Sequence, residues 1–140
     1  MTGSPAGAAL RILSVDDDPV NRMLVRAIVE RTDHPLVQGA VVRDAESLSE
    51  ARRVLATEPI DVILLDVHLP DGLGLDLAAS LHGDGADRPA IVALTASVLP
   101  ADQQAALDAG CDAFLAKPYA AAALIATIAE VTAERRPPAA

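Results

Sequence analysis

Short apolar runs alternate with longer segments of helical period between residues 10 and 133. A run as continuous as Ile60 to Leu65 is typical of a strand that helices cover on both faces of a sheet. The predicted strands span residues 10–15, 37–43, 60–65, 90–94 and 113–116. The first predicted helix begins at Pro19, and the other four span residues 46–56, 73–81, 100–110 and 119–132. The chain therefore consists of five strand–helix units.

The first predicted helix has a defined start. Asp18 can cap its N-terminus, and Pro19 stands at the first helical position, where a missing N–H costs nothing. Apolar side chains at helical spacing predict the face that packs on the sheet: Val20, Leu24, Ala27 and Ile28.

Five strand–helix units in so short a chain predict an α/β fold. Parallel strands need right-handed helical crossovers, and five of them form an open, doubly wound sheet instead of an eight-stranded barrel. We expect a flavodoxin-like, five-stranded parallel sheet in the order 2-1-3-4-5. One domain is expected at 10–133, with flexible ends at 1–9 and 134–140, which are rich in Gly, Pro, Ala and charge.

Composition narrows the possible functions. Twenty acidic residues against eleven basic ones give a formal net charge of −9, which argues against direct binding of nucleic acid and against attraction to anionic membranes. One cysteine, Cys111, forms neither an internal disulfide nor a cysteine metal cluster. The longest apolar run is too short to span a bilayer, so we expect a cytoplasmic protein.

Polar residues follow four of the predicted strands. Asp16 and Asp17 come after the first strand, Asp66 after the third, Thr95 after the fourth and Lys117 after the fifth. Open α/β sheets bind ligands at the carboxyl ends of their strands. In the order 2-1-3-4-5 these four strands are neighbours, so their polar residues should form one site.

The expected site has the chemistry of phosphoryl transfer. Crowded carboxylates repel one another, and a hard divalent cation with oxygen ligands, Mg²⁺ above all, relieves that repulsion. A carboxylate can then act as the nucleophile, while Lys117 and Thr95 bind phosphate oxygens. The sequence therefore predicts a phosphoaspartate site.

Four motifs resemble the response-regulator receiver domain of two-component signalling. They read ILSVDDDP, DVILLDVHLPDGLGLDL, IVALTAS and DAFLAKPY, in the family's order and with similar spacing. The resemblance covers residues 10–133. The segments DPVNR and LTASVLPADQQ resemble those of receivers that are attached to hybrid kinases or stand alone more than those of receivers fused to DNA-binding domains.

The resemblance implies a role for each acidic residue of the site. Asp66 would be the phosphoacceptor, Asp17 a direct Mg²⁺ ligand, and Asp16 a carboxylate that acts on the metal largely through water. His68 would lend its backbone carbonyl to the metal. His68 and Ser97 also stand at positions that tune phosphorylation rates, and His68 departs from the small, amide or Met side chains frequent there.

The resemblance also implies the switch residues. Thr95 would move toward the phosphoryl group, Lys117 would bind it, and Phe114 would turn inward behind Thr95. The Lys117–Pro118 peptide bond would be cis, as in the family.

The family's mechanism supplies the expected partners. The phosphoryl group would come from a phosphohistidine on a histidine kinase or a histidine phosphotransfer protein. Phosphorylation would shift an equilibrium that is read by a protein partner, or a second copy, on the face made by residues 100–110, 113–116 and 119–132. The domain would catalyse only its own phosphorylation and dephosphorylation.

Two other functions remain open at this point. One is a receiver-like interaction module that does not accept phosphate. The other is a phosphatase of the haloacid dehalogenase type, which also uses an aspartyl nucleophile and Mg²⁺. Its motif places a second Asp two residues after the first, where His68 stands in this chain.

Overall fold

The computed structural model describes residues 9–82, 88–97 and 99–135. Residues 1–8 and 136–140 of the expected flexible ends lie outside the described residues. So does most of 83–89, whose Gly-rich composition predicts a loop.

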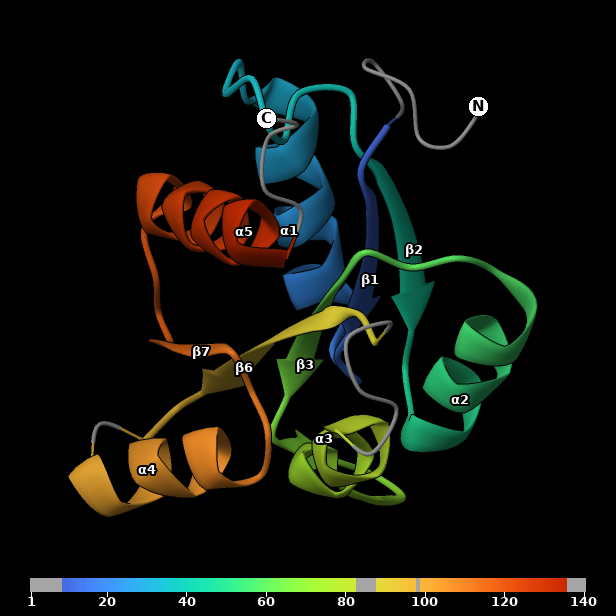
Figure 1. Cartoon of the computed structure of the whole chain (residues 1–140), viewed down its shortest axis with the longest axis vertical. Coiled ribbons are helices and arrows are strands. Elements are labelled where there is room, and N and C mark those ends of the chain that lie inside the picture. The colour runs from blue at the N-terminus through green and yellow to red at the C-terminus, as the bar shows by residue number, and fades with distance from the viewer. Residues whose placement is uncertain (1–8, 83–87, 98, 136–140) are drawn as a thin grey trace.

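A five-stranded parallel sheet forms the centre of the molecule, in the order β2-β1-β3-β6-β7 (Figure 1). Its strands are β1 (Arg11–Val15), β2 (Val41–Ala45), β3 (Val62–Asp66), β6 (Ala90–Thr95) and β7 (Ala113–Ala116). Counted along the chain, this is the predicted order 2-1-3-4-5. The predicted fold class is therefore confirmed.

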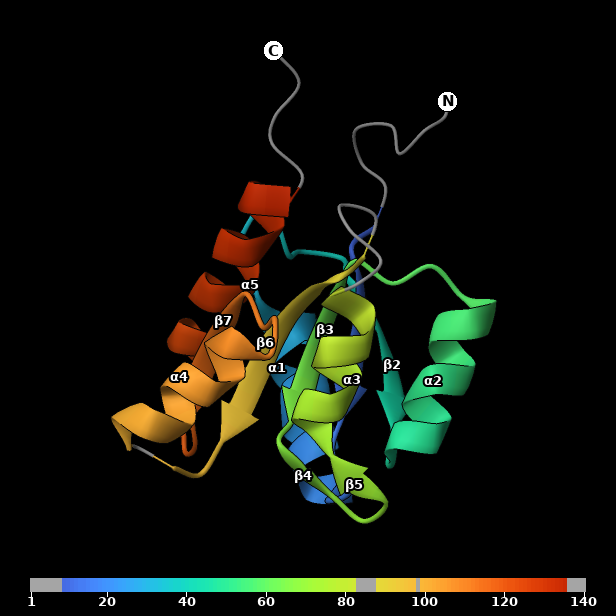
Figure 2. The same cartoon turned by 60° about the horizontal axis from the view of Figure 1, so that its bottom comes forward.

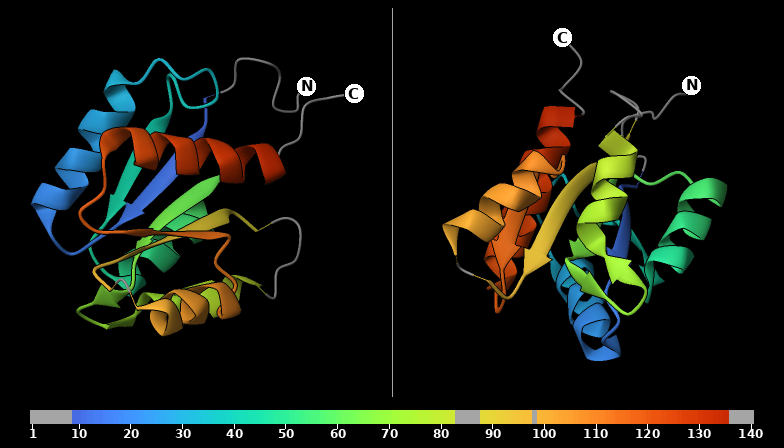
Figure 3. Two further views of the ribbon diagram at one scale, coloured as in Figure 1. Left: turned by 90° about the vertical axis from the view of Figure 1, so that its left-hand side faces the viewer. Right: turned by 90° about the horizontal axis from the view of Figure 1, so that it is seen from below.

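Helices cover both faces of this sheet (Figures 1 and 3). One layer contains α1 (Pro19–Arg31) and α5 (Ala121–Arg135), and the other contains α2 (Leu48–Thr57), α3 (Gly74–His82) and α4 (Pro100–Asp108). Strand residues alternate between the two layers. In β3, Leu64 packs with α1 and α5, whereas Ile63 and Leu65 pack with the other three helices.

The start of α1 is as predicted, but its buried face is so only in part: Ile28 packs against the core as expected. Asp18 caps the helix by accepting a hydrogen bond from the backbone N–H of Val20 at 2.9 Å. The predicted core positions Val20 and Leu24 are 68% and 49% exposed, whereas Val25 and Val29 are buried. Apolar residues occur on more than one side of α1, and packing against the sheet and α5 selects the side that is buried.

The second strand begins later than predicted. The apolar residues from Val37 suggest a strand over 37–43, but β2 spans Val41–Ala45. Val37 is buried in a turn, where its N–H donates to the carbonyl of His34, and Gly39 follows with φ at +81°. Its burial therefore explains the apolar pattern without a strand.

A short antiparallel hairpin lies directly after β3 (Figure 2), around the pair Asp71-Gly72, which is typical of a turn. It consists of β4 (His68–Leu69) and β5 (Gly72–Leu73) and leads straight into α3. The backbone N–H of Gly74 closes its base by donating to the carbonyl of Val67 at 2.7 Å. The segment after Asp66 thus forms a hairpin that is closed at its base by a backbone hydrogen bond.

Candidate functional site

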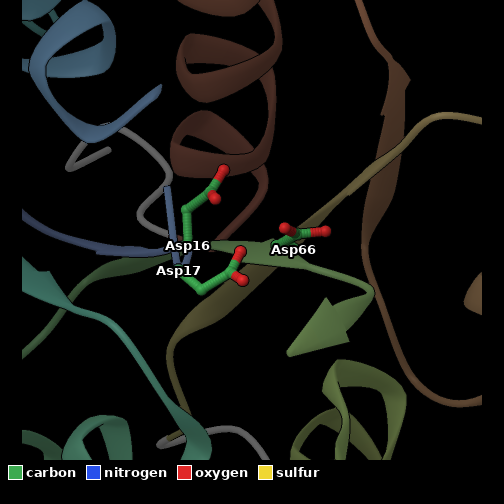
Figure 4. Close-up of side chains that lie close together, drawn as sticks. All are labelled: Asp16, Asp17 and Asp66. Atoms are coloured by element: carbon green, nitrogen blue, oxygen red, sulfur yellow. The ribbon is translucent and has the colours of Figure 1, made fainter. Parts of the chain in front are cut away.

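Three carboxylates meet at the carboxyl ends of β1 and β3 (Figure 4). Asp16 and Asp17 follow β1, and Asp66 is the last residue of β3. One oxygen atom from each side chain lies within 4.8 Å of the others. Asp16 is 3% exposed, Asp66 is half-buried and Asp17 is exposed. The structure therefore brings together the acidic residues that the sequence predicts for one site.

Hydrogen bonds fix two of these carboxylates and the loop that carries them. Oδ1 of Asp16 accepts from the backbone N–H of Asp18 at 2.9 Å, and Oδ1 of Asp66 accepts from the N–H of His68 at 3.2 Å. Nη1 of Arg22 donates to the backbone carbonyl of Asp16 at 2.5 Å. The carboxylates are thus oriented before any ligand binds.

Lys117 bridges the two strands that supply the carboxylates. Its Nζ lies 3.1 Å from Oδ2 of Asp16 and 3.5 Å from Oδ2 of Asp66. Burial by itself lowers the pKa of Lys117, but the hydrogen bond to Asp16 and the charges of both carboxylates outweigh it, so the pKa lies above its usual value. Lys117 is therefore a firmly protonated cation. Its peptide bond to Pro118 is cis.

Asp66 holds its proton more tightly than an ordinary aspartic acid. Burial raises the pKa of Asp66, and the charge of Asp16 raises it further. The charge of Lys117 and the hydrogen bond from the N–H of His68 act in the opposite direction without cancelling that rise. The ionised carboxylate is thus held in a site that under-solvates it, which suits a nucleophile.

Thr95 joins this site to α4. It ends β6, is 7% exposed, and accepts a hydrogen bond from the backbone N–H of Lys117 through its own carbonyl at 2.7 Å. Its Oγ1 accepts from the N–H of Ser97 at 3.0 Å, and the Ser97 hydroxyl donates to the Asp102 carboxylate at 2.5 Å. Asp102 lies in the first turn of α4.

The remaining expected residues occupy different environments. The His68 side chain is exposed, and its backbone lies in β4, next to the acidic cluster. Phe114 lies in β7 and packs, partly buried, against the core layer of α2, α3 and α4. His68 thus lies where its carbonyl could face the acidic cluster, and Phe114 lies on the strand that precedes Lys117.

Two contacts at the site's edge are not predicted by the sequence. Arg22 has the pattern of an ordinary solvent-facing helix residue, yet it contacts the loop of Asp16. Asp71 has the pattern of a turn residue, yet its carboxylate accepts hydrogen bonds from the backbone N–H groups of Leu48 and Ser49 at 2.8 and 3.0 Å. The contact of Arg22 spans six residues and depends on the path of the loop before α1, whereas the contacts of Asp71 are tertiary, joining it to residues more than twenty positions away.

The donor set fits a hard divalent cation. Three carboxylates face the one ammonium of Lys117, so the cluster carries excess negative charge. One oxygen atom of each carboxylate lies within 4.8 Å of the others, so a single cation could be held between them, directly or through water. The site thus has the right charge and donor chemistry for Mg²⁺.

No helix within the described ranges is both long and apolar enough to cross a membrane.

Comparison with known families identifies the type of domain. The model of the response regulator receiver domain matches residues 12–129. The sensory/regulatory protein RpfC of Xanthomonas campestris is 34% identical in an alignment 131 residues long, which covers 91% of this chain and 17% of RpfC. The aerobic respiration control sensor protein ArcB of Escherichia coli is 37% identical in an alignment 122 residues long, which covers 86% of this chain and 15% of ArcB. The chain thus spans about a sixth of these relatives.

A solved structure shows the same fold. The receiver domain protein of Methanospirillum hungatei, described as CheY-like, superposes with a TM-score of 0.78 at 26% identity, covering 91% of this chain and 96% of the other.

Proposed function

The chain belongs to the response regulator receiver family, and from this premise we propose that Asp66 accepts a phosphoryl group from a phosphohistidine of a partner protein, with Mg²⁺ bound at the acidic cluster. Receiver domains are signalling modules that bind Mg²⁺ at such clusters and work with histidine kinases or phosphotransfer proteins. The observation that carries the proposal is the meeting of three carboxylates and Lys117 at the ends of β1, β3 and β7.

The transfer step needs a nucleophile and charge stabilisation. A carboxylate oxygen of Asp66 forms a bond to phosphorus while the P–N bond of the phosphohistidine breaks, and the imidazole ring retains that electron pair. Bound Mg²⁺ would neutralise charge on the phosphoryl oxygens, and Asp16, Asp17, Asp66 and the His68 carbonyl would hold it.

Lys117 and Thr95 would complete the phosphoryl site. The ammonium of Lys117 already lies within 3.5 Å of Asp66, so it is placed to bind an oxygen of a group attached there. The buried hydroxyl of Thr95 would donate a second hydrogen bond. Hydrolysis of the acyl phosphate by water would return Asp66 to its starting state, at a rate influenced by His68 and Ser97.

The exposed side of α1 supports a partner that brings its phosphohistidine to this edge. Val20 and Met23 are 68% and 69% exposed, and both lie in the first part of α1, immediately after the acidic loop. Apolar side chains left exposed beside a reactive group are typical of a docking surface.

The route from the site to the partner face is proposed to run through Thr95. A move of its hydroxyl toward a phosphoryl group would break the hydrogen bond from Ser97, which in turn contacts Asp102 of α4. Phe114 on β7 would respond at the same time. The expected output is a changed surface of α4, β7 and α5, read by a protein partner or by a second copy of the chain.

Intact mass spectrometry tests the proposed function. Wild type and Asp66→Asn are incubated with Mg²⁺ and either acetyl phosphate or phosphoramidate, whose P–N bond mimics that of phosphohistidine. We expect one phosphoryl adduct on wild type, labile to hydroxylamine and absent from Asp66→Asn. If wild type binds Mg²⁺ but neither donor gives an adduct, the chain acts as an interaction module. An equal adduct on Asp66→Asn would place the phosphoacceptor elsewhere.

A further inference from the structure

The tip of the hairpin after Asp66 is attached to the start of a different helix. Asp71 stands between β4 and β5, and its two carboxylate oxygens accept hydrogen bonds from Leu48 N–H at 2.8 Å and Ser49 N–H at 3.0 Å. These are the first two N–H groups of α2. A residue more than twenty positions away in the chain therefore caps this helix.

The rest of the first turn of α2 is capped locally. The hydroxyl of Ser47 accepts from Glu50 N–H at 3.1 Å, and the carbonyl of Ser47 accepts from Ala51 N–H at 3.0 Å. The start of the helix thus has two separate sets of acceptors, one from its own N-cap and one from the hairpin. The hydrogen bonds from Leu48 and Ser49 lower the pKa of Asp71, which strengthens the second set by keeping the carboxylate ionised.

The backbone at the hairpin tip is shaped to fit against α2. Gly72 has φ at +149°, and a Cβ atom there would lie 2.9 Å from Cδ1 of Leu48. The hairpin pairs His68 with Leu73 and Leu69 with Gly72. Leu69 packs, partly buried, against the core, whereas the side chains of His68 and Leu73 are exposed. The two hydrogen bonds from α2 to Asp71 are therefore a second restraint on this segment, and they act at its tip.

We propose that Asp71 is a positioning residue for the metal site: by fastening the hairpin to α2 it fixes the backbone of His68, and with it the carbonyl expected to bind Mg²⁺. This inference rests on the proposed function. Without the two hydrogen bonds, ordering the hairpin would have to accompany metal binding, and its entropic cost would weaken Mg²⁺ affinity.

Two variants separate positioning from helix capping. Asp71→Ala and Ser47→Ala each remove acceptors from the first turn of α2, but only the former releases the hairpin. Isothermal titration with Mg²⁺ measures the dissociation constant, and hydrogen exchange at Leu69 and Gly72 reports the order of the hairpin without metal. We expect Asp71→Ala to raise the dissociation constant about tenfold, as loss of a supporting residue does at other metal sites, and to speed exchange in the hairpin.

Ser47→Ala should lower the melting temperature while leaving Mg²⁺ affinity and hairpin exchange unchanged. Asp71→Asn, which keeps one acceptor oxygen, should lie between wild type and Asp71→Ala and carries the test if the alanine variant does not fold. Equal Mg²⁺ affinity in wild type and both Asp71 variants, or an equal loss in Ser47→Ala, would overturn the positioning role alone. A wild-type chain that binds no Mg²⁺ would overturn the metal site itself.

Discussion

The ammonium nitrogen of Lys117 lies 3.1 Å from Oδ2 of Asp16, a residue 101 positions earlier in the chain. This contact brings the sole lysine of the sequence into a cluster of three carboxylates. Lys117 thus partly neutralises the same charges that would attract a divalent cation.

Replacement of Lys117 by alanine should therefore leave Mg²⁺ binding intact or make it tighter, because the cation no longer competes with an ammonium group for Asp16 and Asp66. The change in α4 and β7 on phosphorylation should be lost, since no ammonium binds the phosphoryl group. Titration calorimetry measures the first effect, and hydrogen exchange with and without a phosphodonor measures the second. Mg²⁺ affinity reduced by about tenfold or more would show that Lys117 holds the carboxylates in place.

Asp66→Asn should stabilise the metal-free protein at neutral pH. The raised pKa means that the folded state holds the Asp66 proton more tightly than the unfolded state, so stability falls as pH rises from the unfolded pKa through the folded one. The asparagine variant avoids that loss because its amide does not ionise, and the two proteins should converge at pH values below the unfolded pKa of about 3.8.

Thermal melts between pH 3 and pH 7 test whether Asp66→Asn is more stable than wild type without metal. Added Mg²⁺ should reverse the sign of this stability difference. At a Mg²⁺ concentration of a hundred times the dissociation constant, wild type gains about 2.7 kcal/mol. The asparagine variant, which lacks one anionic ligand, should gain less. A metal-free Asp66→Asn that melts below wild type at pH 7 would contradict the electrostatic argument.

Gly74→Ala should disrupt the segment that carries the phosphoacceptor. A Cβ at this position would lie 2.2 Å from the backbone oxygen of Asp66, so the backbone itself must move. We expect a loss of at least about 2 kcal/mol in urea denaturation, together with weaker Mg²⁺ binding. Gly39→Ala is the matched control, because its Cβ meets nothing within 4 Å although φ is +81°. It should cost about 1 kcal/mol and leave Mg²⁺ binding unchanged.

Cys111 should resist alkylation in the folded protein. It is 6% exposed, and burial raises the pKa of its thiol to about 11. At pH 8 about one molecule in a thousand then carries the reactive thiolate. A maleimide or disulfide reagent should label it at the rate of unfolding and promptly in urea. Rapid labelling without denaturant would show that the segment at Gly110 opens in the native state.

The sheet and the site could be predicted because each depends on local sequence. An apolar run identifies a strand, the next polar residue identifies what stands at its carboxyl end, and parallel order brings these ends together. Asp16, Asp66 and Lys117 therefore lie where the pattern places them, although Lys117 is far from the others in the chain.

The features that the sequence does not reveal depend on tertiary contacts. Val20 and Val25 are equally hydrophobic, and the packing of α1 against α5 and the sheet determines that Val25 is the one that is buried. Asp71 is a typical turn residue by pattern, and its hydrogen bonds to Leu48 and Ser49 follow only from the path of the hairpin over α2. Local rules locate the elements, whereas packing determines which sides of them meet.

The two helical layers are completed at different stages of protein synthesis. The helices α2, α3 and α4 are consecutive in the chain, so all the helices of their layer are available once residues up to Asp108 have emerged from the ribosome. The other side pairs α1 with α5, the first helix with the last. Val25 and Val29 therefore stay uncovered until Leu124 and Ile128 of α5 have been synthesised. In the growing chain, the side of α1 that carries these two valines is the apolar surface exposed longest to a chaperone.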